Sequence, residues 1–207
     1  MESYQLPQFP AHLSCVHAAL YTDVSDADLL RKRLITASTA EGVDGERERD
    51  ALNFSFIEAR LVWLFSITSV NHMRTAVYQA LLAASQDSLR TKTVHSEIIW
   101  ALNPTNNISE AMRRYGVSDT TTALIAVRIA GPEVLATSVE GDMDAVIKGT
   151  KASFSALPAL TDWAAVKKYH KLGNEAAVRD AKNDLEREHA VVDSIVTSSV
   201  AMKSVMA

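Results

Sequence analysis

Apolar residues recur at intervals of three and four along much of the chain, which is the spacing that places them on one face of an α-helix. This pattern predicts helices over residues 26–37, 69–85, 95–102, 107–115, 133–140 and 162–172, and a long final helix from 174 to beyond 200. The segment 107–115 is the most self-consistent of them. Asn107 and Glu110 have the spacing of a reciprocal N-terminal cap, and Gly116 stands where a left-handed C-terminal residue is favoured.

Two apolar runs predict strands. Cys15–Val24 is apolar almost throughout, and Leu124–Ala130 alternates in the way of a half-buried strand. Phe54–Phe65 is expected to hold a turn of helix and a short buried strand, and Ser25 is expected to cap the helix that follows it. These elements predict an α+β fold: one helix-rich domain over residues 1–207, with a small, mostly antiparallel sheet of roughly three to four strands and a long C-terminal helix.

Two segments lack this periodicity. Residues 39–53 contain Gly42, Gly45 and the charged run Glu46–Asp50, with almost no apolar residue, and are expected to form a charged surface loop. A surface insertion without a role is the simplest interpretation of this loop. Residues 200–207 are expected to be a mobile tail.

Composition indicates a protein with a buried core, because 47% of the residues are apolar and 22% are charged. The net charge is −4 and the isoelectric point is near 5.9, so any contact with RNA has to be a local patch. The longest apolar runs, Leu61–Phe65 and Ala123–Val127, are far shorter than a membrane span, and no secretory signal is visible. We therefore expect a soluble intracellular protein without a membrane partner.

Catalytic and metal-binding motifs are absent from the sequence. It has no HExxH helix, no Cys/His cluster, no phosphate-binding glycine loop and no GxSxG, so we predict no catalytic residue, no metal and no cofactor. Cys15 is the single cysteine, which excludes an internal disulfide. A small hydrolase that uses Cys15 with a histidine is a competing class, but a free cysteine in an apolar strand usually acts as a small buried hydrophobe.

Positive charge gathers in one part of this acidic chain. Between Asn71 and Tyr115 cations outnumber anions, and residues 90–96 alternate cations with hydroxyls just before a predicted helix. Guanidinium and ammonium groups, hydroxyls and unpaired helix N–H groups all bind phosphate oxygens. The pattern favours a contact with RNA or phosphate, with an ordinary charged surface as the alternative.

The same stretch, RTKTVHSEIIWALNPTNNISEAMRRYGV (90–117), resembles the signature of the TPRKB (CGI) family, and the chain looks like a eukaryotic, fungal-type member. The matching parts are the basic-threonine segment, Ser96–Ile99, Leu102–Pro104, Asn107–Ala111 and Gly116–Val117. Further matches are Pro7–Pro10, Phe56–Val62 and Val166–Leu172, so the resemblance extends over nearly the whole chain. Two features depart from the family pattern: the loop at 39–53 is longer than usual, and the C-terminus extends past the usual end of the last helix.

Members of this family are the small regulatory subunit of the EKC/KEOPS complex, which installs threonylcarbamoyl on the adenosine beside the anticodon of tRNAs that read codons beginning with A. The resemblance implies a non-catalytic protein that binds the complex's atypical kinase/ATPase subunit, regulates it allosterically and helps recruit tRNA by its 3′ CCA end. Contact with the remaining subunits, including the carbamoyltransferase subunit, is then indirect. The resemblance also implies a location in nucleus and cytoplasm and, for fungal members, at telomeres, with links to telomere maintenance and transcription.

Two sets of residues are candidate contacts. The tRNA hypothesis rests on side chains at helix starts and loops of the signature: Arg90, Lys92, His95, Ser96, Asn106 and Asn107. The kinase hypothesis rests on the excess of apolar positions on the last helix: Val191, Val192, Ile195 and Val196. The alternatives are that Asn107 is a helix cap alone, that the four apolar residues all lie in the core, and that the protein is a structural adaptor without an RNA contact.

Overall fold

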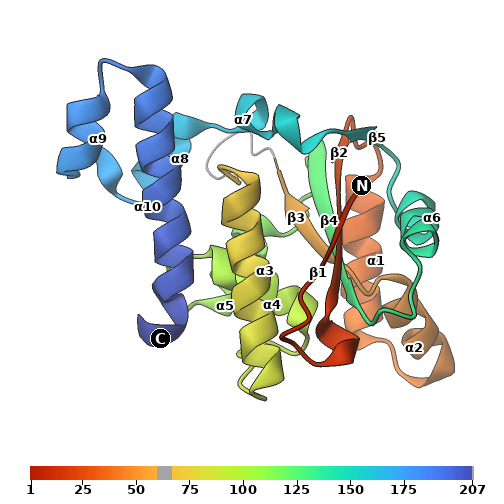
Figure 1. The fold of residues 1–207 in the computed structure, drawn as a ribbon. Coiled ribbons are helices and arrows are strands. Elements are labelled where there is room, and N and C mark those ends of the chain that lie inside the picture. The colour runs from red at the N-terminus through yellow and green to blue at the C-terminus, as the bar shows by residue number, and fades with distance from the viewer. Residues whose placement is uncertain (60–66, 207) are drawn as a thin grey trace.

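An antiparallel sheet forms the centre of the computed structural model, which describes residues 1–59 and 67–206 (Figure 1). Its strands are β1 (Glu2–Gln5), β2 (Cys15–Thr22), β3 (Ser55–Glu58), β4 (Ala123–Ala130) and β5 (Thr150–Ala152). The strand order is β1-β2-β4-β3, and β5 pairs with the last residues of β2. This sheet confirms the predicted α+β class, and the short strands β1 and β5, which the apolar pattern did not indicate, enlarge it.

Helices account for most of the remaining chain. They are α1 (Ala27–Thr39), α2 (Gly42–Ala51), α3 (Val70–Ser85), α4 (Val94–Leu102), α5 (Ile108–Tyr115), α6 (Ala136–Val146), α7 (Leu157–Leu160), α8 (Trp163–Tyr169), α9 (Ala176–Ala181) and α10 (Leu185–Met206). The predictions over 69–85, 95–102 and 107–115 are confirmed as α3, α4 and α5. The helix predicted at 133–140 begins later and runs longer, as α6.

Both faces of the sheet are buried under helices. α3 and α4 cover one face, where Ile98 and Val127 belong to the larger apolar cluster, and α1 and α6 cover the other, where Leu30 belongs to the second cluster (Figure 1). The central strand β4 is therefore buried along its whole length except at Arg128. The prediction of a half-buried strand at 124–130 is wrong, because one charged residue imitated the alternation that a solvated face produces.

Helix caps follow the prediction in part. The side chain of Asn107 accepts the N–H of Glu110 at 2.9 Å, as expected, but the Glu110 carboxylate accepts the Thr105 hydroxyl at 2.7 Å instead of closing the cap. Gly116 is extended, with φ of −80°, so the predicted left-handed residue is wrong. Ser25 does not cap α1, since its hydroxyl donates to a backbone carbonyl just after α6.

The segment 39–53 contains helix α2, so the prediction of a loop is wrong for residues 42–51. α2 packs against α1: Arg33 pairs with Glu48 at 2.8 Å, and Arg49 donates to two carbonyls at the C-terminal end of α1. Glu and Arg are good helix formers, but a helix built from them lacks the apolar periodicity on which the prediction rested. The side chains of this segment are mostly exposed, as predicted.

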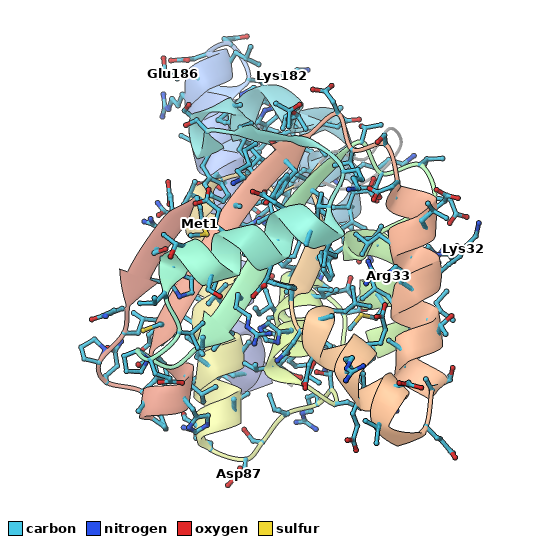
Figure 2. The ribbon with its side chains drawn as sticks, turned by 90° about the vertical axis from the view of Figure 1, so that its right-hand side faces the viewer. Met1, Lys32, Arg33, Asp87, Lys182 and Glu186 are labelled. Carbon is cyan, nitrogen blue, oxygen red and sulfur yellow. The ribbon has the colours of Figure 1, made fainter. Side chains whose placement is uncertain are left out.

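The C-terminal segment forms two helices instead of the single helix predicted from 174. α9 and α10 meet at a turn marked by Lys182 and Glu186, at the opposite end of the molecule from Asp87 (Figure 2). The prediction of a mobile tail is wrong for residues 200–206, which continue α10 and bury Val200 and Lys203 against the body of the protein.

One predicted segment is only partly described. The short buried strand expected within 54–65 is confirmed as β3, whereas residues 60–65, including the apolar run Leu61–Phe65, lie outside the described residues. Among the helices of residues 1–59 and 67–206, none combines the length and the apolar character needed to cross a bilayer.

Candidate functional site

The loop before α4 folds around a buried carboxylate. Glu97 is 1% exposed, and its oxygens accept the backbone N–H groups of Arg90 (3.1 Å) and Thr91 (2.8 Å). They also accept the Thr91 hydroxyl at 2.6 Å. Several donors around one carboxylate are the arrangement that stabilises a buried charge. The buried Glu97 carboxylate therefore fixes the backbone of this loop. The side chains of Arg90 and Lys92 are exposed on the loop.

Ser96 belongs to the N-terminal cap of α4. The Thr93 hydroxyl accepts the N–H of Ser96 at 3.1 Å, and the Ser96 hydroxyl accepts the N–H of Thr93 at 3.2 Å, which closes a capping box. Two N–H groups that would otherwise attract a phosphate are thus already paired. Ser96 therefore holds the start of the helix and leaves Arg90 and Lys92 as the exposed cations beside it.

His95 is a core residue. It is buried, and its Nε2 accepts the backbone N–H of Ile129 on β4 at 3.0 Å. Burial, with a smaller contribution from the charge of Arg128, lowers the pKa of His95 to about 3. A neutral imidazole in the core has no free edge for a nucleotide. We therefore correct the tRNA hypothesis by removing His95 from it.

The loop between α4 and α5 is also fixed by hydrogen bonds from a buried side chain. Asn103 is fully buried, and its amide nitrogen donates to the carbonyls of Thr105 (3.1 Å) and Asn107 (3.4 Å). Its amide oxygen accepts the hydroxyl of Tyr169 from α8. Asn106 and Asn107 are exposed on this loop. Because the oxygen of Asn107 caps α5, the amide nitrogen of that side chain is the part that remains for a ligand.

A groove of about 200 Å³ lies along α4, beside the loop that carries Arg90. α3, α4 and the end of α10 line it, and its residues include Gln79, Arg90, Trp100 and Lys203. α4 has nine residues, so its ends are roughly 14 Å apart. The structure thus divides the tRNA candidates into two groups, with Arg90 and Lys92 before α4 and with Asn106 and Asn107 after it.

Lys203 lies in the segment predicted to be a mobile tail, but it is a buried residue of α10. Val196, Val200 and Lys203 follow at i, i+4 and i+7, and all three are buried. A lysine on the apolar stripe of a helix is a signal that it has buried partners, because an unpaired charge is rarely found in a core. That spacing was visible in the sequence once the helix was extended past residue 200.

Two of the four kinase candidates are core residues. Val192 and Val196 are fully buried in a small apolar cluster to which α8, α9 and α10 contribute, so the hypothesis is corrected for these two positions. Val191 and Ile195 are partly buried and pack against the same cluster. Only Val191 and Ile195 therefore remain available to a partner.

The exposed face of α10 is uncharged over most of its length. Its residues follow at intervals of three and four: Ala190, Ser194, Ser198, Met202 and Val205. Met202 is 54% exposed and Val205 is 82% exposed. Asp193 and Lys203, the two charged residues in this range, are partly buried and buried. The two exposed apolar residues at the end of this face, Met202 and Val205, are the part of it that resembles a protein contact surface.

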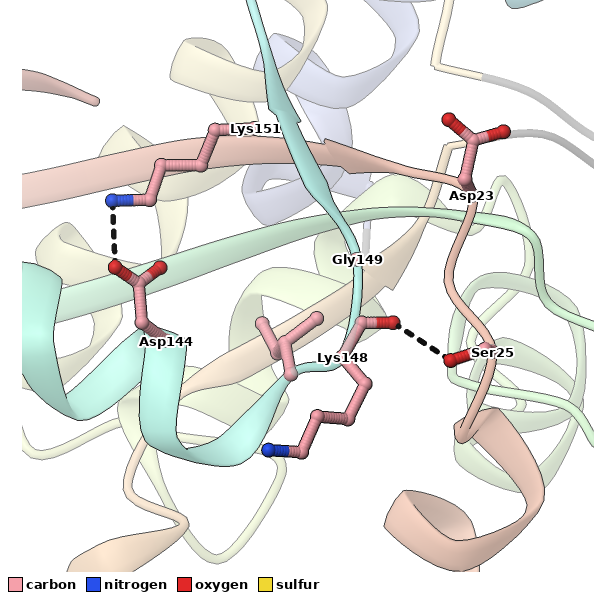
Figure 3. A pocket seen from close by; sticks show the side chains of 7 residues that line it. Asp23, Ser25, Asp144, Lys148, Gly149 and Lys151 are labelled. Carbon is pink, nitrogen blue, oxygen red and sulfur yellow. Dashed lines mark hydrogen bonds and ion pairs between the residues drawn. The ribbon is translucent and has the colours of Figure 1, made fainter.

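A second depression, of about 570 Å³, lies beside β5 (Figure 3). Acidic and basic side chains line it together: Lys151 pairs with Asp144 at 2.8 Å, and Asp23 and Lys148 lie close by. The hydroxyl of Ser25 donates to the carbonyl of Lys148 at 3.4 Å across its floor. Mixed charges in an open depression concentrate neither sign, so it is not a candidate for binding RNA.

Cys15 is buried in β2, in agreement with its interpretation as a small apolar residue. Its sulfur lies 3.9 Å from the Ser14 hydroxyl, and His17 bonds with the Ser3 hydroxyl at 2.8 Å. Within the described part of the chain, Cys15 therefore lacks the imidazole partner that the hydrolase hypothesis requires. The same residues contain no group of three His, Cys, Asp or Glu side chains placed to hold a metal.

The sequence profile of the family described as kinase binding protein CGI-121 matches residues 21–204. The chain belongs to the CGI-121 family. The EKC/KEOPS complex subunit CGI121 of Cryptococcus neoformans is 31% identical over 233 residues, which cover 97% of this chain and 100% of the relative. The relative of the same name from Aspergillus fumigatus is 31% identical over 189 residues, 90% of this chain and 91% of its own. That of Neurospora crassa is 31% identical over 220 residues, 98% of each chain.

The CGI-121 match confirms the predicted family. It runs from β2 to the end of α10 and contains every residue of both contact hypotheses. The family is described by what it binds, a kinase, and not by a reaction. The exposed face of α10 lies within the matched residues up to position 204.

Proposed function

We propose that this protein is a non-catalytic subunit of an EKC/KEOPS complex that docks on the complex's kinase/ATPase subunit, regulates it, and helps recruit tRNA by its 3′ CCA end. The observation that carries the proposal is the family match over nearly the whole chain, together with relatives of that complex at 31% identity. Threonylcarbamoylation of tRNAs that read codons beginning with A is then the activity it supports. Nucleus, cytoplasm and telomeres are the locations where we expect it.

The RNA surface that we propose consists of the exposed groups at the two ends of α4. Arg90 and Lys92 supply cations for phosphates, and Asn106 and Asn107 supply amides for the edges of splayed bases. A single-stranded 3′ end exposes both phosphates and base edges, which suits cations at one end of α4 and amides at the other. The negative charge of the rest of the chain favours contact at a local patch over contact along a tRNA body.

The double variant Arg90→Ala with Lys92→Ala is expected to weaken tRNA binding and to lower its dependence on salt. Each lost phosphate contact with a single strand reduces the slope of log affinity against log salt by about 0.7, so the pair reduces it by about 1.4. Alanine at position 90 keeps the loop intact, because Arg90 holds Glu97 through its backbone N–H. Filter binding over a series of salt concentrations measures both quantities.

The matched control is Lys182→Ala with Arg187→Ala, which removes the same charge at the α9–α10 turn, far from α4 (Figure 2). It is expected to leave the slope unchanged. A tRNA that lacks its CCA end is expected to bind the wild-type protein as weakly as intact tRNA binds the Arg90→Ala, Lys92→Ala variant. Two results together would contradict the RNA contact: tRNAs with and without the CCA end bind equally, and Arg90→Ala with Lys92→Ala changes neither affinity nor salt slope. The protein would then be a structural adaptor without an RNA contact.

The kinase-docking surface that we propose is the uncharged face of α10, continued by Val191 and Ile195. The cores of protein interfaces contain fewer charged residues and more apolar residues than the rest of the protein surface. A helix face of small and apolar residues also allows a partner to pack closely against it. Ser194 and Ser198 are small, and Met202 and Val205 are the exposed apolar groups at the end of this face.

Ser198→Asp with Met202→Asp is expected to weaken binding to the purified kinase subunit at least about 100-fold, because a charge buried in an interface without a partner costs several kcal/mol. Leu29→Asp with Ile35→Asp is the matched control, since these apolar residues on α1 are 56% and 54% exposed. Val191→Asp with Ile195→Asp tests whether these two partly buried residues beside the face also contact the kinase subunit. Pull-down and calorimetry measure the affinities, and an unchanged affinity of folded Ser198→Asp, Met202→Asp protein rules out this face.

A further inference from the structure

Lys203 is a buried cation near the end of α10. It is 6% exposed, and its ammonium donates to the carbonyls of Trp100, Asn103 and Thr105, the last at 3.1 Å. The ammonium also lies 3.8 Å from the centroid of the Trp100 ring. One side chain from the C-terminal helix therefore holds the end of α4 and the loop that follows it.

The carbonyls that Lys203 binds belong to the C-terminal end of α4 and to the loop that follows it. The last carbonyls of a helix have no partner within it, and they carry the negative end of the helix dipole. At α4 this end points into the loop that carries Asn106 and Asn107. The Trp100 indole N–H donates to the carbonyl of Asn106 at 3.4 Å, so a third carbonyl group of the loop, after those of Asn103 and Thr105, is also turned toward the protein.

We propose that Lys203 is a positioning residue for the RNA contact: it turns the carbonyls of loop 103–107 inward, neutralises the negative end of α4 and leaves the amides of Asn106 and Asn107 facing the RNA. This inference rests on the function proposed above. Lys203 itself touches no phosphate, because it is buried and its donors are already bonded to carbonyls. It acts by fixing the conformation of loop 103–107 and by making the electrostatic potential at the end of α4 less negative.

The charge of Lys203 depends on pH in the neutral range. Burial lowers its pKa to about 8, against the opposing attraction of Glu97 on α4. Besides Glu97, the charged or titratable side chains beside the groove and the loop include Arg90 before α4, Tyr169 from α8, and the pair Glu110–Arg114 of α5. Hydrogen bonds from Thr105 and Arg114 lower the pKa of Glu110, so this carboxylate stays ionised in the neutral range. Burial raises the pKa of Tyr169 to about 12, so its hydroxyl stays protonated below pH 9. We expect Lys203 to lose its proton between pH 7 and pH 9 and the loop to loosen as it does.

The test compares Lys203→Met and Lys203→Arg with the full-length wild-type protein, using a tRNA with an intact CCA end. Lys203→Met is expected to bind about tenfold more weakly, a loss of about 1.4 kcal/mol, with an unchanged salt slope. Wild-type affinity is expected to fall by a similar factor from pH 7 to pH 9, whereas Lys203→Arg stays charged and keeps its affinity. Lys182→Met, which removes an exposed lysine, is expected to behave like the wild type.

A second readout does not involve RNA. Hydrogen exchange at the amides of 105–107 is expected to be faster in Lys203→Met, and faster in the wild type at pH 9 than the intrinsic pH dependence of exchange explains. If wild-type protein binds tRNA and both Lys203→Met and the pH series leave affinity unchanged, the positioning role is overturned and the proposed function stands. If wild-type protein does not bind tRNA at all, the proposed RNA function fails and this inference fails with it. If Lys203→Met does not fold, the pH profiles of wild type and Lys203→Arg decide.

Discussion

Replacing Glu97 by alanine is expected to lower the free energy of unfolding by about 3 kcal/mol and to release the loop that carries Arg90 and Lys92. The carboxylate is buried and accepts two backbone N–H groups and one hydroxyl from that loop. Alanine leaves these donors without an acceptor, and an unsatisfied buried donor costs about 1–3 kcal/mol. Urea unfolding followed by tryptophan fluorescence measures the loss, and tRNA binding by the folded fraction is expected to weaken as well.

Two further variants separate the charge from the hydrogen bonds. Glu97→Gln keeps one acceptor oxygen and is expected to lose less than Glu97→Ala. Thr91→Val removes the hydroxyl alone and is expected to cost about 1 kcal/mol. If Glu97→Ala unfolds within about 0.5 kcal/mol of the wild type, the carboxylate does not organise the loop, and the rigid presentation of Arg90 and Lys92 loses its basis.

The predicted helices α1, α3 and α5 have an apolar stripe, whereas α2, which was not predicted, has none. α3 and α5 bury one face each, so burial and periodicity coincide there, whereas α4 is buried on nearly all sides. α2 is held through Arg33–Glu48 and through Arg49, so its stability comes from polar contacts with a neighbouring helix that local sequence does not reveal. The break between α9 and α10 was missed for a related reason, because helical spacing on both sides continued across a polar turn.

The sequence predicts which segment carries the candidate site but not which contacts its side chains make. Spacing correctly assigned Arg90, Lys92, Asn106 and Asn107 to loops and helix starts. It did not reveal that His95 faces β4 or that Lys203, 103 positions after Trp100, binds the end of α4. Which side chain is left exposed depends on partners brought together by the tertiary fold, and these are invisible to a local pattern. The same holds on α10, where Val192 and Val196 are core residues but the equally apolar Val191 and Ile195 are only partly buried.

Acid is expected to unfold this protein steeply below pH 6.5, because three histidines are held neutral in its interior. Burial lowers the pKa of His72 and His95 to about 3 and that of His170 to about 4. In the unfolded chain each of these histidines takes up a proton as the pH falls through about 6.5, whereas in the folded protein it does not. Each therefore removes about 1 kcal/mol of stability per pH unit between pH 6.5 and its folded pKa.

One buried carboxyl works in the opposite direction. Burial raises the pKa of Glu58 on β3 to about 7, so the folded protein holds this proton at pH values where the unfolded chain has released it. Falling pH then stabilises the folded state by about 1 kcal/mol per unit from pH 7 to about pH 4.5, which offsets one histidine. The sum of three losses and one gain is a net loss of about 2–3 kcal/mol per pH unit between pH 6 and pH 5.

Urea unfolding at pH 7, 6 and 5 measures this slope, and His95→Gln assigns a share of it to one side chain. Glutamine offers an oxygen to the N–H of Ile129, as the imidazole Nε2 does, but takes up no proton. His95→Gln is expected to change stability little at pH 7 and to reduce the acid slope by about 1 kcal/mol per unit, while His12→Gln, at an exposed position, is expected to leave it unchanged. A His95→Gln slope equal to that of the wild type means that His95 is protonated in the folded protein. It would then not be the neutral acceptor that joins α4 to β4, and its removal from the RNA-contact set would lose its support.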